Sequence, residues 1–164
     1  MDKSSPFGKE LPNNMSRFPL NPVVNFRACG DCQACCTVVG VTELDKPHWA
    51  RCQHQCASGC AIYEERPRTC RGYSCLWAAG LLEGDEERRP DRLGIILDLR
   101  NASNSDTVRP GDRVLIQIWE VWPQALDRPD VAALVNRIAE TCLVVVRRYG
   151  SEAPTSATER VATE

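Results

Sequence analysis

Residues 29–36 read CGDCQACC and place four cysteines within eight positions, in a chain that has ten. Cys29, Cys32 and Cys35 follow the pattern C-x2-C-x2-C, and Cys36 comes directly after it. Thiolates bind zinc and iron–sulfur clusters well, and a two-residue spacer lets one turn of backbone present two sulfurs to one centre. Consecutive side chains diverge in helices and strands, so we expect Cys35 or Cys36 to serve a second centre or to pack. The stretch predicts a metal-binding segment.

The backbone of this stretch has two interpretations. In a continuous helix Cys29, Cys32 and Cys36 would share one face and leave Cys35 off it. Gly30 weakens a helix at its start, so a turn leading into a helix is the alternative. Both bring sulfurs from at least two turns together.

The cysteine-rich segment extends to residue 75 and contains nine of the ten cysteines. Its later members are Cys52, Cys56, Cys60, Cys70 and Cys75. The segment shows little hydrophobic periodicity, so we expect metal ligands to organise it more than an apolar core does. A zinc ion bound by four thiolates leaves excess negative charge, which the nearby Arg66, Arg68 and Arg71 are suited to offset.

Composition narrows the class of protein. A chain of 164 residues with 43% hydrophobic content suits one domain with tails. The net charge of −2 favours neither nucleic acid nor an anionic membrane as a partner, and no apolar run is long enough to cross a bilayer. The N-terminus lacks the apolar core of a secretory signal. We therefore expect a cytoplasmic protein, in which clustered cysteines indicate metal rather than disulfides.

The predicted fold class is α+β, with an irregular cysteine-rich module that has short helices, followed by a small β-β-α-β layer. We expect a flexible arm over 1–25, one domain over 26–150 (metal module 26–82, β-β-α-β part 92–149) and a disordered tail over 151–164. Strands are predicted in 92–100, 113–122 and 143–150. A helix is predicted over 128–142, with Pro129 in its first turn and apolar residues on one face. A short helix over 76–82 should lead into a charged turn at 83–92.

Residues 60–75 read CAIYEERPRTCRGYSC, which extends the pattern to C-x-I-Y-E-x-R-P-x-x-C-R-x-Y-x-C. With the opening C-x2-C-x2-CC, this stretch resembles the small bacterial CxxCxxCC family, the cysteine-cluster family described as a zinc- or iron-chelating domain. The resemblance covers roughly residues 26–77. It departs from the family at Cys56, an extra cysteine, and at Ser74, where we expect proline. The resemblance implies eight metal ligands: Cys29, Cys32, Cys35, Cys36, Cys52, Cys60, Cys70 and Cys75.

The same resemblance implies that Tyr63 and Arg66 belong to the framework between the ligands. The segment is also similar to the cysteine-rich part of larger flagellin lysine methylases, which suggests that such a domain can accompany a modification reaction. The chain shows no Gly-rich loop for a nucleotide-like cofactor. It also lacks the C-x3-C-x2-C spacing associated with radical enzymes that use S-adenosylmethionine.

Zinc and an iron–sulfur cluster both fit the ligands. Two zinc sites would use eight cysteines, whereas one 4Fe–4S cluster would use four. The pattern C-x2-C-x2-C with a remote fourth cysteine resembles the motif that binds such a cluster in bacterial ferredoxins. The ferredoxin's fourth cysteine precedes proline, whereas Cys36 and Cys70 precede Thr37 and Arg71. The adjacent Cys35–Cys36 pair is unusual for a zinc ribbon and favours iron–sulfur.

Other residues are expected to be structural. Cys142 lies on the apolar face of the predicted helix, where a cysteine is expected to be a small buried apolar residue. Cys56 is interpreted as a non-ligand, and Glu120 is interpreted as part of the end of the predicted strand. His48 and His54 flank Cys52, but eight thiols already fill two tetrahedral sites. No catalytic constellation accompanies the cysteines.

The sequence thus predicts a metal-binding accessory, sensor or metal-handling protein. One alternative is an iron–sulfur-dependent redox or protein-modification enzyme. Another is a structural zinc domain that binds a protein partner.

Overall fold

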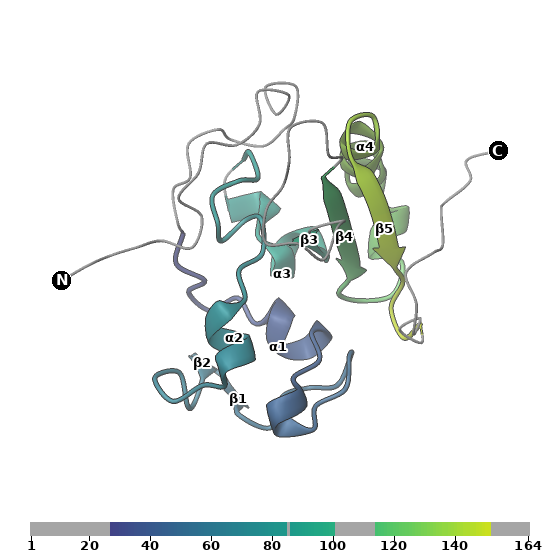
Figure 1. The fold of residues 1–164 in the computed structure, drawn as a ribbon. Coiled ribbons are helices and arrows are strands. Elements are labelled where there is room, and N and C mark those ends of the chain that lie inside the picture. The colour runs from purple at the N-terminus through teal and green to yellow at the C-terminus, as the bar shows by residue number, and fades with distance from the viewer. Residues whose placement is uncertain (1–26, 85, 101–113, 152–164) are drawn as a thin grey trace.

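The computed structural model describes residues 27–84, 86–100 and 114–151, and its fold belongs to the α+β class. Its main sheet has the strand order β3-β4-β5, formed by Ile95–Arg100, Leu115–Glu120 and Leu143–Arg147 (Figure 1). β3 and β4 are antiparallel, whereas β4 and β5 are parallel. A parallel pair needs a crossover, and helix α4 (Pro129–Ala139) provides it. The predicted α+β class is therefore confirmed.

One face of the sheet packs against α4. Ile116 and Ile118 of β4 are fully buried and belong to the same apolar cluster as Val131, Leu134 and Ile138 of the helix. These three helix residues follow the predicted i, i+3, i+7 spacing. Pro129 occupies the first turn of α4, where a proline leaves no hydrogen bond unmade. Burial of this cluster holds the sheet and α4 together in the second half of the chain.

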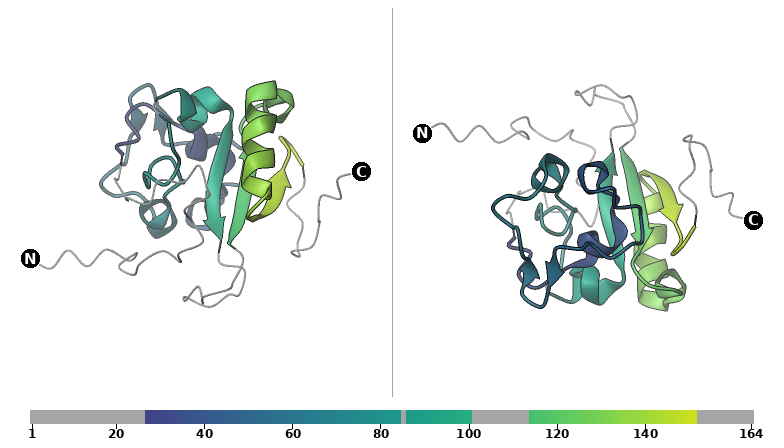
Figure 2. Two further views of the ribbon diagram at one scale, coloured as in Figure 1. Left: turned by 90° about the horizontal axis from the view of Figure 1, so that it is seen from above. Right: turned by 90° about the horizontal axis from the view of Figure 1, so that it is seen from below.

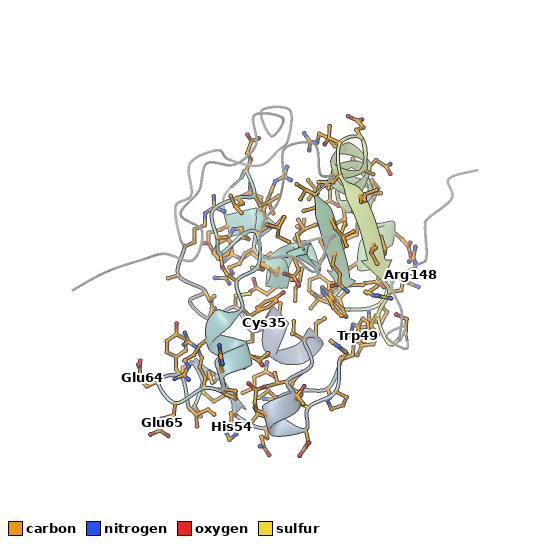
Figure 3. The ribbon with its side chains drawn as sticks, viewed as in Figure 1. Cys35, Trp49, His54, Glu64, Glu65 and Arg148 are labelled. Atoms are coloured by element: carbon orange, nitrogen blue, oxygen red, sulfur yellow. The ribbon has the colours of Figure 1, made fainter. Side chains whose placement is uncertain are left out.

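The opposite face of the sheet packs against the cysteine-rich half (Figure 2). Ile96 and Trp119, which lie opposite each other in β3 and β4, form an apolar cluster with Ala34 and Val38. Trp49 also lies between the two halves, and its indole N–H donates to the Glu120 carbonyl at 2.9 Å (Figure 3). Because both faces are covered, both sets of alternating residues in β4 are largely apolar.

The cysteine-rich half consists of short elements joined by turns. They are α1 (Ala34–Val38), η2 (Thr42–Leu44), the β1–β2 hairpin (Gln55–Cys56 and Gly59–Cys60) and α2 (Arg68–Gly72). Three more short helical elements follow the cysteine-rich half in the sequence. They are η3 (Glu86–Arg88) and α3 (Pro90–Leu93) before β3, and η4 (Ala125–Asp127) before α4. Such short elements contribute few helical hydrogen bonds, so this part of the structure depends on contacts between segments.

The predicted helix over 76–82 is wrong. Residues 76–80 form turns, in which Gly80 N–H donates to the Trp77 carbonyl at 3.0 Å. Gly80 has a φ of 71°, a left-handed conformation that ends a helical path and that glycine adopts easily. The apolar side chains of this segment, Leu76 and Leu82, are nevertheless buried in the core. The apolar residues of this segment are thus buried without a helix.

The two ends of the chain lie outside the described residues. The arm over 1–25 is not described, nor is the tail beyond Ser151, so the predictions for both stay predictions. Across the described ranges, every helix is too short or too polar to span a bilayer.

Candidate metal centre

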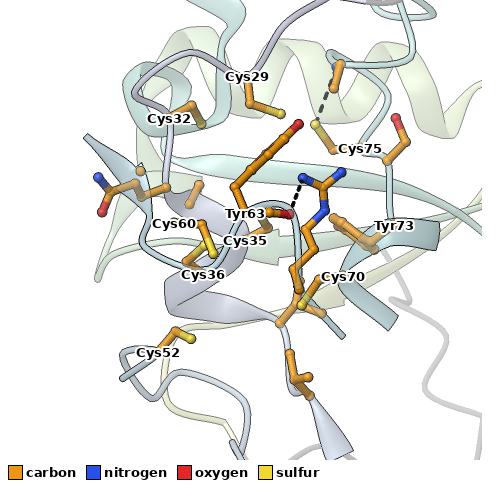
Figure 4. Close-up of a pocket in the computed structure, with 18 of the residues that line it drawn as sticks. Cys29, Cys32, Cys35, Cys36, Cys52, Cys60, Tyr63, Cys70, Tyr73 and Cys75 are labelled. Carbon is orange, nitrogen blue, oxygen red and sulfur yellow. Dashed lines mark hydrogen bonds between the residues drawn. The ribbon is translucent and has the colours of Figure 1, made fainter. Parts of the chain in front are cut away.

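A cavity of about 500 Å³ lies in the cysteine-rich half (Figure 4). Its wall includes all eight of the cysteines that the sequence indicated as ligands: Cys29, Cys32, Cys35, Cys36, Cys52, Cys60, Cys70 and Cys75. The other two cysteines, Cys56 and Cys142, are not part of this wall. All ten are free thiols. The fold therefore brings together thiols that are up to 46 positions apart in the sequence.

The opening stretch forms a turn followed by a helix. Cys32 N–H donates to the Cys29 carbonyl at 3.0 Å, and Gly30 has a φ of 57°, which favours glycine. Cys35 and Cys36 then lie in the first turn of α1. This arrangement agrees with the second interpretation of CGDCQACC, because the helix includes only the last two of its four cysteines.

The remaining wall cysteines come from four separate segments. Cys52 lies in a loop, and its N–H donates to the Cys36 carbonyl at 3.1 Å. Cys60 lies in β2, Cys70 in α2, and Cys75 in the chain that leads to the turns at 76–80. The Ala78 N–H donates to the Cys75 sulfur at 3.4 Å, an interaction that favours a thiolate.

An ion-pair network around the buried Arg89 side chain holds the first turn in place. The Arg89 guanidinium contacts Asp31 at 2.8 Å, and it also forms a two-point contact with the Asp91 carboxylate at 2.7 and 2.8 Å. Asp31 lies between Cys29 and Cys32, so Arg89 connects the turn to α3. Asp91 also makes a hydrogen bond with the Cys32 thiol. The network thus joins the cavity to the part of the chain that carries the sheet.

A buried lysine also lines the cavity. Lys46 is 8% exposed, and its ammonium donates to the Val39 carbonyl at 2.6 Å and to the Thr37 carbonyl at 3.4 Å. Burial lowers its pKa, while the nearby Cys52, Cys36, Cys35 and Cys70 act in the opposite direction. Sequence reasoning missed Lys46, because no spacing rule connects this residue with the cysteines.

The arginines differ in their relation to the cavity. Arg66 lines it, acts electrostatically on Cys29, and lies over the Tyr63 ring at 3.7 Å from the ring centroid. Arg71 also lines the cavity, whereas Arg68 does not. Arg66 is therefore placed to offset thiolate charge, as is Lys46.

The protonation of the thiols depends on their surroundings. Burial raises the pKa of Cys29, Cys70 and Cys75, and it raises the pKa of Cys32 to about 11. A hydrogen bond between neighbouring thiols raises the pKa of Cys35 and lowers that of Cys36 to about 7. Because metals bind thiolates, metal binding here must release protons.

The donor set fits a soft or borderline metal. Thiols are the ligands of zinc and of iron–sulfur clusters, and a cavity of about 500 Å³ is within the size range of cofactor sites. In the part of the chain that the structure describes, no three His, Cys, Asp or Glu side chains are arranged to hold a single metal ion. The eight thiols instead surround the cavity. Their residue type fits the predicted group.

The residues interpreted as structural have other contacts. His54 lines the cavity, whereas His48 stacks on Trp119 with ring centroids 4.7 Å apart and accepts a hydrogen bond from the Gly40 N–H at 2.9 Å. Both Glu120 carboxylate oxygens accept backbone hydrogen bonds, from Leu126 at 3.1 Å and from Tyr149 at 2.8 Å. Cys142 is buried in the core with α4. These contacts agree with structural roles for His48, Glu120 and Cys142.

The fold and the cavity together define an α+β protein with a thiol-lined cavity. Comparisons of the chain with protein-family models, with curated proteins and with solved structures found no match.

Proposed function

We propose that this protein binds metal through the eight cavity thiols and serves as an accessory, sensor or metal-handling protein. The observation that carries the proposal is the composition of the cavity wall. It includes the eight cysteines that the family resemblance implies as ligands and leaves out the other two. We also propose that the chain is a member of the CxxCxxCC family, on the residue pattern of 29–75. The reduced thiols this site needs favour the cytoplasm.

Of the two metal groups, we favour an iron–sulfur cluster. The thiols line one cavity of about 500 Å³, which has room for a polynuclear cluster as well as for separate ions. The adjacent cysteines of α1 are also unusual for a zinc ribbon. When bound, such a cluster would supply one-electron redox chemistry. The chain's own contribution would be the thiolates, the Lys46 and Arg66 charges, and the apolar wall.

The test is to purify the full chain without air and to measure its visible spectrum together with its iron, zinc and sulfide content. A brown protein with matched iron and sulfide supports the iron–sulfur form. A colourless protein with about two zinc ions per chain also supports metal binding, but favours a structural zinc domain. A protein that retains neither metal would refute the proposal.

Variants of single cysteines test the ligand assignment. Cys32→Ser and Cys70→Ser each remove a wall thiol, so we expect less bound metal in both. Cys56→Ser is the matched control, because it removes a thiol outside the wall. If Cys32→Ser and Cys70→Ser retained as much metal as Cys56→Ser, the cavity thiols would not be the ligands.

A further inference from the structure

We propose that two copies of this chain form a symmetric dimer through the outer edge of strand β5. The β5 strands of the two copies would pair antiparallel, so that both β3-β4-β5 sheets join into one continuous sheet. Each copy offers the same edge to the other, as a two-fold symmetric interface requires. No residue of β5 lines the thiol cavity, so this inference does not depend on metal binding.

The two edges of the sheet differ in how they are covered. β3 is one outer strand, and the Leu76 N–H covers its edge by donating to the Leu97 carbonyl at 2.8 Å. Ile95, Ile96 and Leu97 of β3 are fully buried. β5 is the other outer strand (Figure 1), and each of its residues is half-buried or exposed. Among the described residues, the accessible edge of the sheet is therefore that of β5.

The backbone of β5 has unused hydrogen-bonding groups along this edge. The Leu143 N–H donates to the Val114 carbonyl at 3.0 Å, so the backbone groups of Leu143 point toward β4. Inward and outward residues alternate along a strand, which places the backbone groups of Val144 and Val146 on the outer edge. No other segment within residues 27–84, 86–100 and 114–151 donates a backbone hydrogen bond to these groups or accepts one from them. Such an unpaired row is a template for another strand.

The side chains of β5 lack the features that usually keep an edge strand from pairing. Its sequence is LVVVR, in which the first four residues are apolar and none is proline. Natural edge strands commonly carry lysine, proline or a bulge that prevents association. Leu143, at the start of β5, is 41% exposed and is one of three exposed large apolar side chains in the described ranges. Pairing of the edge would bury part of this apolar surface.

Maximal overlap of the two strands defines the register. A pairing centred on Val145 places Val144 of each copy opposite Val146 of the other, and opposed outward residues exchange both backbone hydrogen bonds. Leu143 of each copy then lies opposite Arg147 of the other, and the apolar stem of an arginine can cover an exposed leucine. Every outward group of the two valines gains a partner in this arrangement.

The charges at the two ends of β5 favour a second copy in the antiparallel orientation. Val144 and Val146 pack against the same apolar cluster as α4, and Arg148 continues this face and contacts Asp127, just before α4, at 3.1 Å. Glu140, at the end of α4, is exposed and precedes β5. Antiparallel pairing brings Glu140 of each copy toward Arg148 of the other, at both ends of the contact. A second β5 in the parallel orientation would instead bring like charges together.

The test measures the mass of the full chain by analytical ultracentrifugation, with reductant present so that no disulfide joins two copies. We expect a species of about twice the 18.3 kDa of one chain at high protein concentration. It should dissociate on dilution, because one pair of short strands buries less area than the roughly 1,600 Å² of a standard interface. A chain that stays a monomer at the highest soluble concentration would refute the proposal.

A proline variant tests the edge itself. Val144→Pro removes an outward N–H that a single copy does not use, and such edge positions tolerate proline. We expect a folded monomer, with the fold checked by circular dichroism. Val144→Ala is the matched control, because it shortens the side chain but keeps the N–H, and it should still form dimers. If Val144→Pro dimerised as well as Val144→Ala, the β5 edge would not be the interface.

Charge reversal tests the orientation of the two copies. Glu140→Lys and Arg148→Glu each place like charges at both ends of the contact, so each should weaken the dimer roughly 10-fold. An equal mixture of the two variants restores opposite charges at both ends and should dimerise about as tightly as the wild type. A mixture that dimerised no better than the separate variants would rule out the antiparallel arrangement.

Hydrogen exchange of the wild type locates the interface without any variant. The amides of Val144 and Val146 should exchange more slowly in the dimer than in the dilute monomer, whereas the Val145 amide, which faces β4, should change little. A dimer that left both outward amides unprotected would be joined by another surface. Protection of these amides in a monomer would mean that another segment of the chain covers the edge, and would likewise overturn the proposal.

Discussion

Arg89→Met tests whether the ion-pair network around Arg89 holds the first cysteine turn against the rest of the fold. The Arg89 side chain is only 9% exposed. Its guanidinium contacts Asp91 at two points, Asp31 at 2.8 Å and Glu86 at 3.2 Å. Methionine keeps much of the apolar stem but removes the charge and all of these contacts. The perturbation therefore isolates the ionic part of the network.

The size of the effect follows from the exposure of each partner. Asp91 is 32% exposed, so its two-point contact should contribute about 1.5–3 kcal/mol, the range for hydrogen bonds to charged groups. Asp31 and Glu86 are 73% and 54% exposed, and contacts with such exposed carboxylates contribute about 0.2–1 kcal/mol each. We therefore expect Arg89→Met to lower the free energy of unfolding by about 3 kcal/mol.

The assay is urea unfolding of the full chain as purified, followed by tryptophan fluorescence. Trp49 and Trp119 lie where the cysteine-rich half meets the sheet, so their fluorescence reports on the unfolding of both parts of the structure. Arg92→Met is the matched control, because Arg92 is 54% exposed and its contact with Glu86 is long, at 3.8 Å. The control should lose less than about 0.5 kcal/mol. A loss in Arg89→Met no larger than that of the control would refute the reasoning.

The stability difference between the wild type and Arg89→Met should depend on pH. Burial alone would raise the pKa of Asp91, but the hydrogen bonds and charge of Arg89 outweigh burial and lower it. A carboxyl whose pKa is lowered by folding contributes stability above its ordinary pKa, about 3.9, and loses it as the pH falls through the lower folded value. The difference in stability between the wild type and Arg89→Met should therefore be full near neutral pH and shrink below about pH 4.

Two further substitutions test the cavity and the core. Lys46→Met removes the buried cation beside Cys52, Cys36, Cys35 and Cys70, so it should weaken Zn²⁺ binding roughly 10- to 100-fold in a competition titration, while Lys46→Arg, which keeps the charge, should lose less. Equal Zn²⁺ affinity in Lys46→Met and the wild type would contradict this role. Ile118→Ala opens a cavity at a fully buried site and should cost about 2–5 kcal/mol in urea unfolding. Leu143→Ala, at a side chain that is 41% exposed, should cost far less, and similar losses in both would argue against this core.

The hydrophobic periodicity of the sequence predicted much of the secondary structure in the second half of the chain. The alternating residues of β4 and the one-sided apolar spacing of α4 depend on periods of two and of 3.6 residues, which are visible in the sequence. The prediction failed at residues 76–82, where Leu76 and Leu82 are buried although residues 76–80 form turns and the segment has no helix. Burial of apolar residues does not by itself specify helical backbone, and Gly80 permits the turn.

The sequence by itself indicated which thiols are candidates, because the residue pattern of 29–75 and the family that it resembles can be read from the chain alone. Only the tertiary structure decided that these eight thiols share one cavity, and that Cys56, although it lies between two of them in sequence, is outside its wall. It also decided that the Lys46 ammonium lies beside the Val39 carbonyl and that Arg89 contacts Asp31, which is far from it in the sequence. The physical reason is that charge interactions and burial depend on distance in space, which the order of residues does not specify.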